Sequence, residues 1–148
     1  MRCLDLFAGT GALGFEAASR GAQLVILLEK DKKAHANLNA NFALLQSSPA
    51  AGVVEILQRD SLEFLKQQAD RSSNLIFIDP PFQDSSLLDR AVIEAGRVCD
   101  DASGGGIYVE FPSSRPREEI EALLPDWHCG KYLEAGQVKA CLFRGGRG

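Results

Sequence analysis

Short apolar runs alternate with helical patterns along most of this sequence. Continuous apolar runs are typical of strands buried on both faces, and their alternation with helices indicates parallel pairing through crossover connections. The predicted strands are Cys3–Phe7, Leu24–Glu29, Val53–Gln58, Leu75–Ile78 and Gly106–Phe111. The predicted helices are Gly11–Arg20, Lys32–Leu45, Ser61–Ala69, Leu87–Val98 and Arg117–Leu124. This pattern constrains the chain to an open α/β sheet with helices on both faces.

The C-terminal part departs from this alternation. Two further strands are predicted at Trp127–Leu133 and Val138–Phe143, with only Glu134–Gln137 between them. Four residues cannot hold a crossover helix, so these strands must form an antiparallel hairpin. The predicted fold is therefore a doubly wound, mostly parallel seven-stranded sheet with a C-terminal antiparallel hairpin. We expect one domain over residues 1–144, a loop at 46–52 and a flexible tail at 145–148.

Composition and charge exclude several classes of protein. The 148 residues are 45% hydrophobic and 24% charged, as in a globular domain. The longest aliphatic run, Leu24–Leu28, is far shorter than the roughly 20 residues that span a bilayer, and Asp5 interrupts any signal-peptide core. The four cysteines form no Cys-x-x-Cys pair, so we expect reduced thiols, a cytoplasmic location and no metal site. The net charge of −4 argues against binding nucleic acid by phosphate neutralisation alone.

A glycine-rich segment follows the first predicted strand. Gly9, Gly11 and Gly14 have the spacing Gly-x-Gly-x-x-Gly between a strand and a helix, which is the context that this motif requires for cofactor binding. Glycines there permit a tight turn and the close approach of a ligand to a helix N-terminus. Glu29 lies at the end of the second predicted strand, from which a carboxylate can accept hydrogen bonds from ribose hydroxyls.

The glycine segment alone does not distinguish NAD from S-adenosylmethionine (AdoMet). Asp5 favours AdoMet, because a carboxylate would repel a pyrophosphate but attract a cationic amino group. Hydrogen bonds from backbone N–H groups to Asp5 are compatible with either cofactor. Asp60 is predicted to be a helix N-cap, and the same turn would meet an adenine ring in the crevice. The predicted cofactor site comprises Asp5, Phe7, Gly9, Thr10, Gly11, Glu29, Lys30, Asp60, Ser61 and Asp79.

The sequence Asp-Pro-Pro-Phe at 79–82 follows the fourth predicted strand. Its two prolines make the loop rigid and remove two N–H donors, which leaves carbonyl acceptors facing the crevice. An exocyclic amine on a flat base could donate to the Asp79 carboxylate and the Pro80 carbonyl while Phe82 stacks on the ring. These acceptors would aim the nitrogen lone pair at a methyl donor. The predicted catalytic residues are therefore Asp79, Pro80, Pro81 and Phe82.

These segments together resemble class I methyltransferases with an Asp-Pro-Pro-[Phe/Tyr] motif. More narrowly, they are similar to the RsmD family of bacterial 16S ribosomal RNA guanine-N2 methyltransferases. The matching segments occur in collinear order at Leu4–Gly14, Ala18–Ala22, Leu28–Asp31, Ile78–Phe82, Ile107–Glu110 and Ala135–Val138.

The resemblance implies a role for each group of motif residues. Asp5, Gly9 and Gly11 would hold the amino-acid part of AdoMet. Glu29 would bind the ribose, and Asp60 would bind the adenine amine. Residues 79–82 would bind a guanine flipped out of 16S ribosomal RNA, at a cost of a few kcal/mol for unstacking. We expect a monomer that acts on RNA within an assembling small subunit and has no membrane partner.

One feature departs from the family pattern. Members carry a basic segment rich in Arg and Thr before the first strand, whereas Met1 here stands directly at that strand. One hypothesis is therefore a cofactor-binding core that is inactive without the basic segment, and the charge of −4 is then that of a core without its basic arm. Two other hypotheses are amino-methylation of another base or of a protein amide, and a nicotinamide oxidoreductase.

Overall fold

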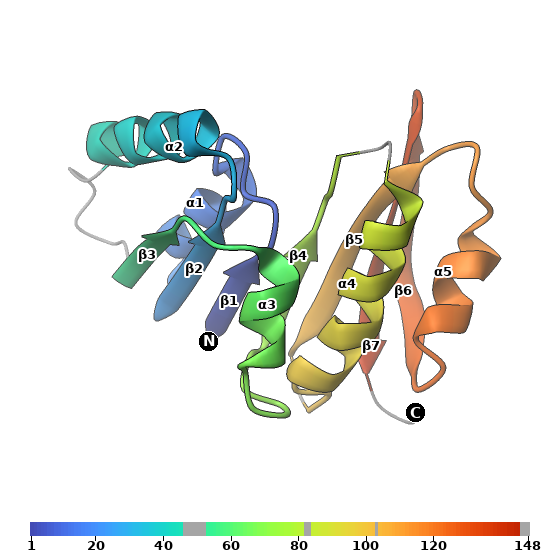
Figure 1. Cartoon of the computed structure of the whole chain (residues 1–148). Coiled ribbons are helices and arrows are strands. Elements are labelled where there is room, and N and C mark those ends of the chain that lie inside the picture. Colours follow the sequence, from blue (N-terminus) through green and yellow to red (C-terminus); the bar gives the residue numbers. More distant parts are fainter. Residues whose placement is uncertain (46–52, 82–83, 103, 146–148) are drawn as a thin grey trace.

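In the computed structural model the chain forms one seven-stranded sheet with helices on both faces (Figure 1). The structure describes residues 1–45, 53–81, 84–102 and 104–145. The strands are β1 (Arg2–Asp5), β2 (Leu24–Leu28), β3 (Val53–Leu57), β4 (Leu75–Ile78), β5 (Gly106–Pro112), β6 (Trp127–Ala135) and β7 (Val138–Gly145). The helices are α1 (Ala12–Ser19), α2 (Lys32–Leu45), α3 (Ser61–Lys66), α4 (Ser85–Val98) and α5 (Arg117–Leu123).

The strand order is β3-β2-β1-β4-β5-β7-β6. The first five strands in this order are parallel, and β7 is antiparallel to both β5 and β6. This confirms the predicted doubly wound sheet with a C-terminal hairpin. The chain leaves β1 toward β2 and β3 and then returns to β4 on the other side of β1. The carboxyl ends of β1 and β4 therefore border the crevice where ligands bind in folds of this kind.

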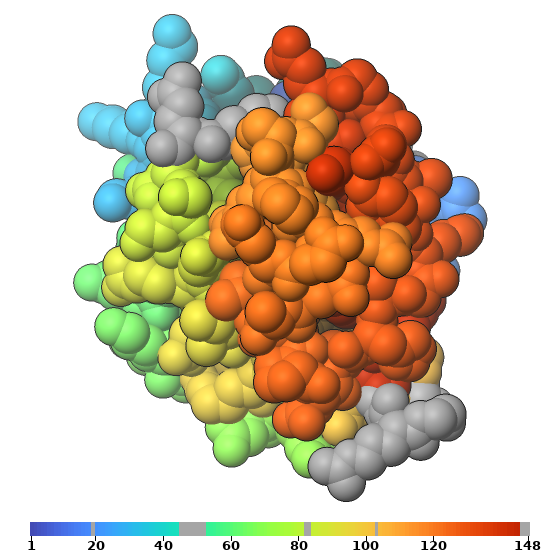
Figure 2. All heavy atoms as spheres, turned by 90° about the vertical axis from the view of Figure 1, so that its right-hand side faces the viewer, coloured from blue at the N-terminus to red at the C-terminus, as the bar shows by residue number. Residues whose placement is uncertain are grey.

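The core lies in two layers because successive strand residues face opposite sides of the sheet. Leu4, Ile76 and Ile107 face one side, where they pack with buried residues of α3, α4 and α5. Val25 and Leu27 face the other side, where they pack with buried residues of α1 and α2. In Figure 1, α3, α4 and α5 lie in front of the sheet. Figure 2 shows that α5 and the β6–β7 hairpin form much of one side of the molecule.

Several predicted boundaries were wrong at the ends of elements. The β6–β7 turn has two residues instead of four, since β6 extends to Ala135 and Gly136 adopts a φ of 61° at the turn. Helix α3 ends at Lys66 instead of Ala69. Gly145, predicted to be in the tail, pairs with Trp127 at the end of β7.

Two predictions cannot be compared with the structure. The predicted loop at 46–52 and the remaining tail residues 146–148 lie outside the described residues. Within the described ranges, none of the helices has the length and apolarity that a membrane span requires.

The interior strand β5 supplies a test of core packing. Ile107 is fully buried, and its replacement by alanine should reduce the free energy of unfolding by about 2–5 kcal/mol through lost burial and a residual cavity. Ile93 on α4 is 53% exposed, so Ile93→Ala should change stability by less than about 1 kcal/mol. Urea denaturation of both variants measures the difference, and equal effects would contradict this assignment of the core.

Candidate cofactor and substrate site

Acidic side chains lie at or near the carboxyl ends of five neighbouring parallel strands. In spatial order from β3 to β5 they are Asp60, Glu29, Asp5, Asp79 and Glu110. Because the strands are parallel, these ends share one edge of the sheet. The predicted site residues that the structure describes are therefore gathered at one edge, although they come from distant parts of the sequence.

The glycine loop makes the tight turn that its sequence predicts. Gly9 and Gly11 have φ values of 55° and 86°, a region that other residues rarely adopt. A Cβ atom on Gly11 would lie 2.3 Å from the Phe15 ring and 2.6 Å from Leu38, whereas a Cβ on Gly9 would meet nothing within 4 Å. Gly11 is thus required by packing as well as by backbone conformation, while the space beside Gly9 is open to a ligand.

Glu29 fixes the glycine loop against the end of β2. Its Oε1 accepts a hydrogen bond from the Gly9 N–H at 3.2 Å, and its Oε2 accepts one from the Asp31 N–H at 3.1 Å. Each carboxylate oxygen can accept more than one hydrogen bond, so hydroxyl donors can still bind there. Thr10 is exposed at the loop, and its carbonyl oxygen accepts a hydrogen bond from the Asn41 side-chain amide at 3.3 Å.

Asp5 is a buried acid at the end of β1, with 2% of its surface exposed. Burial raises its pKa to about 7; hydrogen bonds from the Phe7 and Gly14 backbone oppose this shift, and the nearby Asp79 and Glu29 carboxylates add to it. In the described part of the chain no Lys or Arg forms a salt bridge with Asp5. A buried carboxyl without a cationic partner is suited to bind a cationic group of a ligand.

A cavity of about 630 Å³ lies beyond the carboxyl ends of β1, β2 and β3, next to the starts of α3 and α4. Six of the residues that line it are predicted site residues: Phe7, Glu29, Lys30, Asp60, Ser61 and Pro81. Asp60 caps α3 as predicted, because its Oδ1 accepts a hydrogen bond from the Glu63 N–H at 3.0 Å. Its Oδ2 lies 3.7 Å from the exposed Lys30 Nζ. The Ser61 hydroxyl donates to the Leu6 carbonyl and so fixes the start of α3 to the residue after β1.

Asp79 forms a pair of acids with Glu110. Ile78 pairs with Val109 in the sheet, so the following residues, Asp79 and Glu110, are neighbours on adjacent strands. Burial raises the pKa of Asp79 to about 7, and the charge of Glu110 and a hydrogen bond with its carboxyl add to this shift. Glu110 Oε1 also accepts a hydrogen bond from the Tyr108 hydroxyl at 2.7 Å.

Sequence analysis did not include Glu110 or Tyr108 among the site residues. One signal could have revealed Glu110: it is an acid near the end of an otherwise apolar strand. Its proximity to Asp79 depends on the register between β4 and β5, which no local pattern specifies.

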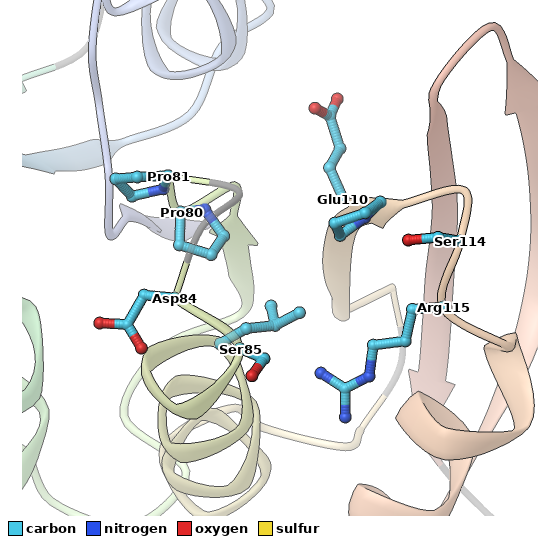
Figure 3. A pocket seen from close by; sticks show the side chains of 9 residues that line it. Pro80, Pro81, Asp84, Ser85, Glu110, Ser114 and Arg115 are labelled. Carbon is cyan, nitrogen blue, oxygen red and sulfur yellow. The ribbon is translucent and has the colours of Figure 1, made fainter.

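A second cavity, of about 250 Å³, separates Pro80 and Pro81 from the segment after β5 (Figure 3). Arg115 lines this cavity but is held by Asp89 at 2.6 Å and Glu119 at 2.8 Å. Figure 3 shows the Glu110 carboxylate pointing away from Arg115. The fourth predicted catalytic residue, Phe82, lies outside the described residues.

A sheet with this strand order, a glycine loop after β1 and acids at the switch point that form no salt bridge among the described residues together indicate an AdoMet-dependent methyltransferase. Residues 1–144 match the model of a family described as conserved hypothetical protein 95. Ribosomal RNA small subunit methyltransferase D from Escherichia coli strain K12 is 35% identical over 150 residues, which cover 97% of this chain and 68% of that protein. The Haemophilus influenzae protein of the same name is 37% identical over 146 residues, which cover 96% of this chain and 70% of that protein.

A solved structure agrees with these sequence comparisons. A putative methyltransferase from Escherichia coli, yhhF, superimposes with a TM-score of 0.77 at 31% identity, covering 97% of this chain and 75% of the other. The chain therefore belongs to the ribosomal RNA small subunit methyltransferase D family, and AdoMet is its methyl donor. This sets aside the nicotinamide oxidoreductase hypothesis.

The buried Asp5 predicts a pH-dependent effect on stability. A folded-state pKa of about 7, above the ordinary value of 3.8, means that the folded protein keeps a proton that the unfolded chain has released. Asp5 therefore lowers stability as pH rises from about 4 to 7, and the penalty is complete above 7. Asp5→Asn, which cannot ionise, should raise the melting temperature by several degrees at pH 8 and by less at pH 4.5.

The same variant separates stability from ligand binding. Calorimetric titration at pH 8 should show AdoMet affinity reduced about tenfold or more in Asp5→Asn, since the amide carries no charge to bind a cation. A variant that is more stable yet binds AdoMet normally would contradict the role of Asp5 as a cation site.

Proposed function

We propose that this chain transfers a methyl group from AdoMet to the exocyclic N2 amine of a guanine in small-subunit (16S) ribosomal RNA. The observation that carries this proposal is the position of Asp79 and Pro80 at the end of β4, next to the buried Asp5 at the end of β1. The names of the relatives support ribosomal RNA as the substrate. Action within an assembling subunit and a monomeric state stay predictions.

The proposed binding of AdoMet uses the acids along the sheet edge. Asp5 binds the cationic amino group, and the open space beside Gly9 admits the amino-acid part. Glu29 accepts hydrogen bonds from the ribose, and Asp60 accepts one from the adenine amine. Lys30 positions Asp60 through their 3.7 Å contact.

The remaining predicted cofactor residues complete this arrangement. Phe7 and Ser61 line the large cavity and supply its wall next to the cofactor. Gly11 and Thr10 continue the turn that places the Gly9 backbone beside the ligand. Asp79 lies close enough to Asp5 to raise its pKa, which supports a place for Asp79 next to the proposed cofactor site.

The proposed chemistry depends on how the amine is held. The N2 lone pair of guanine is delocalised into the ring, so the nitrogen is a poor nucleophile until its geometry changes. The Asp79 carboxylate and the Pro80 carbonyl accept its two hydrogens and aim the lone pair along the line of transfer. AdoMet supplies a methyl group on a sulfonium sulfur, which becomes a neutral thioether when the carbon–sulfur bond breaks and the carbon–nitrogen bond forms. Ionised Asp79 accepts the proton that the nitrogen then loses.

The assay is transfer to small ribosomal subunits isolated from cells that lack the modification. Tritiated AdoMet measures the rate, and mass spectrometry of the digested RNA identifies the methylated nucleoside. Asp79→Asn should lower the rate about 100-fold or more, because an amide accepts a proton poorly. The matched control is Asp126→Asn, a substitution at an exposed position in the turn before β6, which should leave the rate unchanged. Product other than N2-methylguanosine, or full activity of Asp79→Asn, would contradict the proposal.

The rate should also depend on pH. Asp79 must be ionised to accept the proton that the amine loses, and its pKa in the free protein is raised to about 7. The single-turnover rate is therefore expected to rise with pH and to level off once Asp79 is ionised. The midpoint of this rise should lie at or below about pH 7, since a bound cation favours ionised Asp79. The groups that face Asp79 are Glu110, Tyr108 and Asp5. A rate that falls as pH rises from 5.5 to 7.5 would contradict this assignment.

A further inference from the structure

Two acids lie side by side on the substrate side of the site, and the proposed chemistry uses only one of them. Asp79 is the acceptor for the amine, whereas Glu110, one strand further from Asp5, has no role in methyl transfer. Neighbouring strands in a sheet are about 4.8 Å apart, so the two carboxyl groups can contact adjacent atoms of one base. Because Phe77 pairs with Tyr108 and Ile78 with Val109, the side chains of Asp79 and Glu110 lie on the same face of the sheet.

A tyrosine on the same strand holds the Glu110 side chain in one orientation. The Tyr108 hydroxyl donates to Glu110 Oε1 at 2.7 Å, and the Tyr108 ring contacts the Phe77 ring edge to face with centroids 6.1 Å apart. The tyrosine occupies one oxygen and leaves the other available to a ligand. No salt bridge neutralises Glu110 among the described residues, and its carboxylate points away from Arg115 (Figure 3). Glu110 thus presents an acceptor and repels other acceptors.

Guanine matches a pair of adjacent acceptors better than the other bases with an exocyclic amine. Its Watson–Crick edge carries two neighbouring donors, N1–H and the N2 amine. Adenine and cytosine instead carry an acceptor nitrogen next to their amine. An acceptor placed against a carboxylate leaves both groups unsatisfied, which strongly disfavours the wrong base.

We propose that Glu110 is a specificity-determining residue that accepts the guanine N1–H while Asp79 accepts the N2 amine. This assignment rests on the proposed function, because it names how that site selects its base. It also assigns a positioning role to Tyr108, which holds Glu110 in place. In this arrangement the guanine N1–H donates to the Glu110 oxygen that Tyr108 does not occupy.

The test compares guanosine with 2-aminopurine riboside, which keeps the N2 amine but has an acceptor at N1. Competition binding is measured by ligand-observed NMR at pH 8 with S-adenosylhomocysteine present. The unmodified chain should bind guanosine about tenfold or more tightly than 2-aminopurine riboside. Glu110→Gln should bring the ratio close to one, because an amide can accept from N1–H or donate to an unprotonated N1. The glutamine has the same shape and can still accept from Tyr108, so folding should be preserved.

The chain contains a matched control for this substitution. On β6 the Tyr132 hydroxyl donates to Glu134 Oε1 at 2.6 Å, which repeats the tyrosine–glutamate pair of β5 on the exposed hairpin. Glu134→Gln should leave the nucleoside ratio unchanged. Tyr108→Phe should lower the guanosine preference by a smaller factor than Glu110→Gln, because the carboxylate stays but loses its fixed orientation.

The outcomes separate this inference from the proposed function. A guanosine preference that Glu110→Gln abolishes supports the role of Glu110, whatever the RNA assay shows. Equal binding of the two nucleosides by the unmodified chain, no binding of guanosine, or an unchanged ratio in Glu110→Gln would overturn it. Failure of the unmodified chain to form N2-methylguanosine in ribosomal RNA, with the preference intact, would instead contradict the proposed function.

Discussion

The site depends on acids that the fold keeps close together without neutralising them. Asp5 and Asp79 end the two strands at which the sheet order reverses, and each has a pKa raised to about 7 by burial and by neighbouring carboxylates. Such an arrangement weakens the folded protein at neutral pH, and it persists because the hydrophobic layers on both faces fix the strands. A cationic cofactor bound at this point, as proposed, would relieve the repulsion and so link ligand binding to stability.

Several residues at this edge have a structural role in addition to the proposed contacts with ligand. Glu29 bridges the glycine loop and the start of the next segment, and Asp60 caps α3. These hydrogen bonds hold the carboxylates in place before a ligand binds. Because little ordering remains to be done on binding, less affinity is lost to conformational entropy. Variants of these residues will therefore alter local structure and ligand binding together.

Part of the acidic character of the chain is concentrated at one edge of the sheet. Five acids gather at the carboxyl edge of the sheet, where they suit a cationic cofactor and a base with several hydrogen-bond donors. They would not attract the phosphate groups of RNA. The proposed recognition at this edge would therefore depend on hydrogen bonds to the base itself and not on attraction of the phosphates.

The sequence by itself determined which segments are strands and helices, because the period of apolar residues differs between the two. It also predicted Asp5, the glycine loop and Asp79–Pro81 as site residues, since these predictions depend on residue types at fixed local spacing. Element ends such as Lys66 and Gly145 were less certain because tertiary contacts decide them. Only the tertiary structure decided that Glu110 lies beside Asp79. Local periodicity tells which face a residue takes, whereas the neighbour of a strand and its register are set by packing between distant segments.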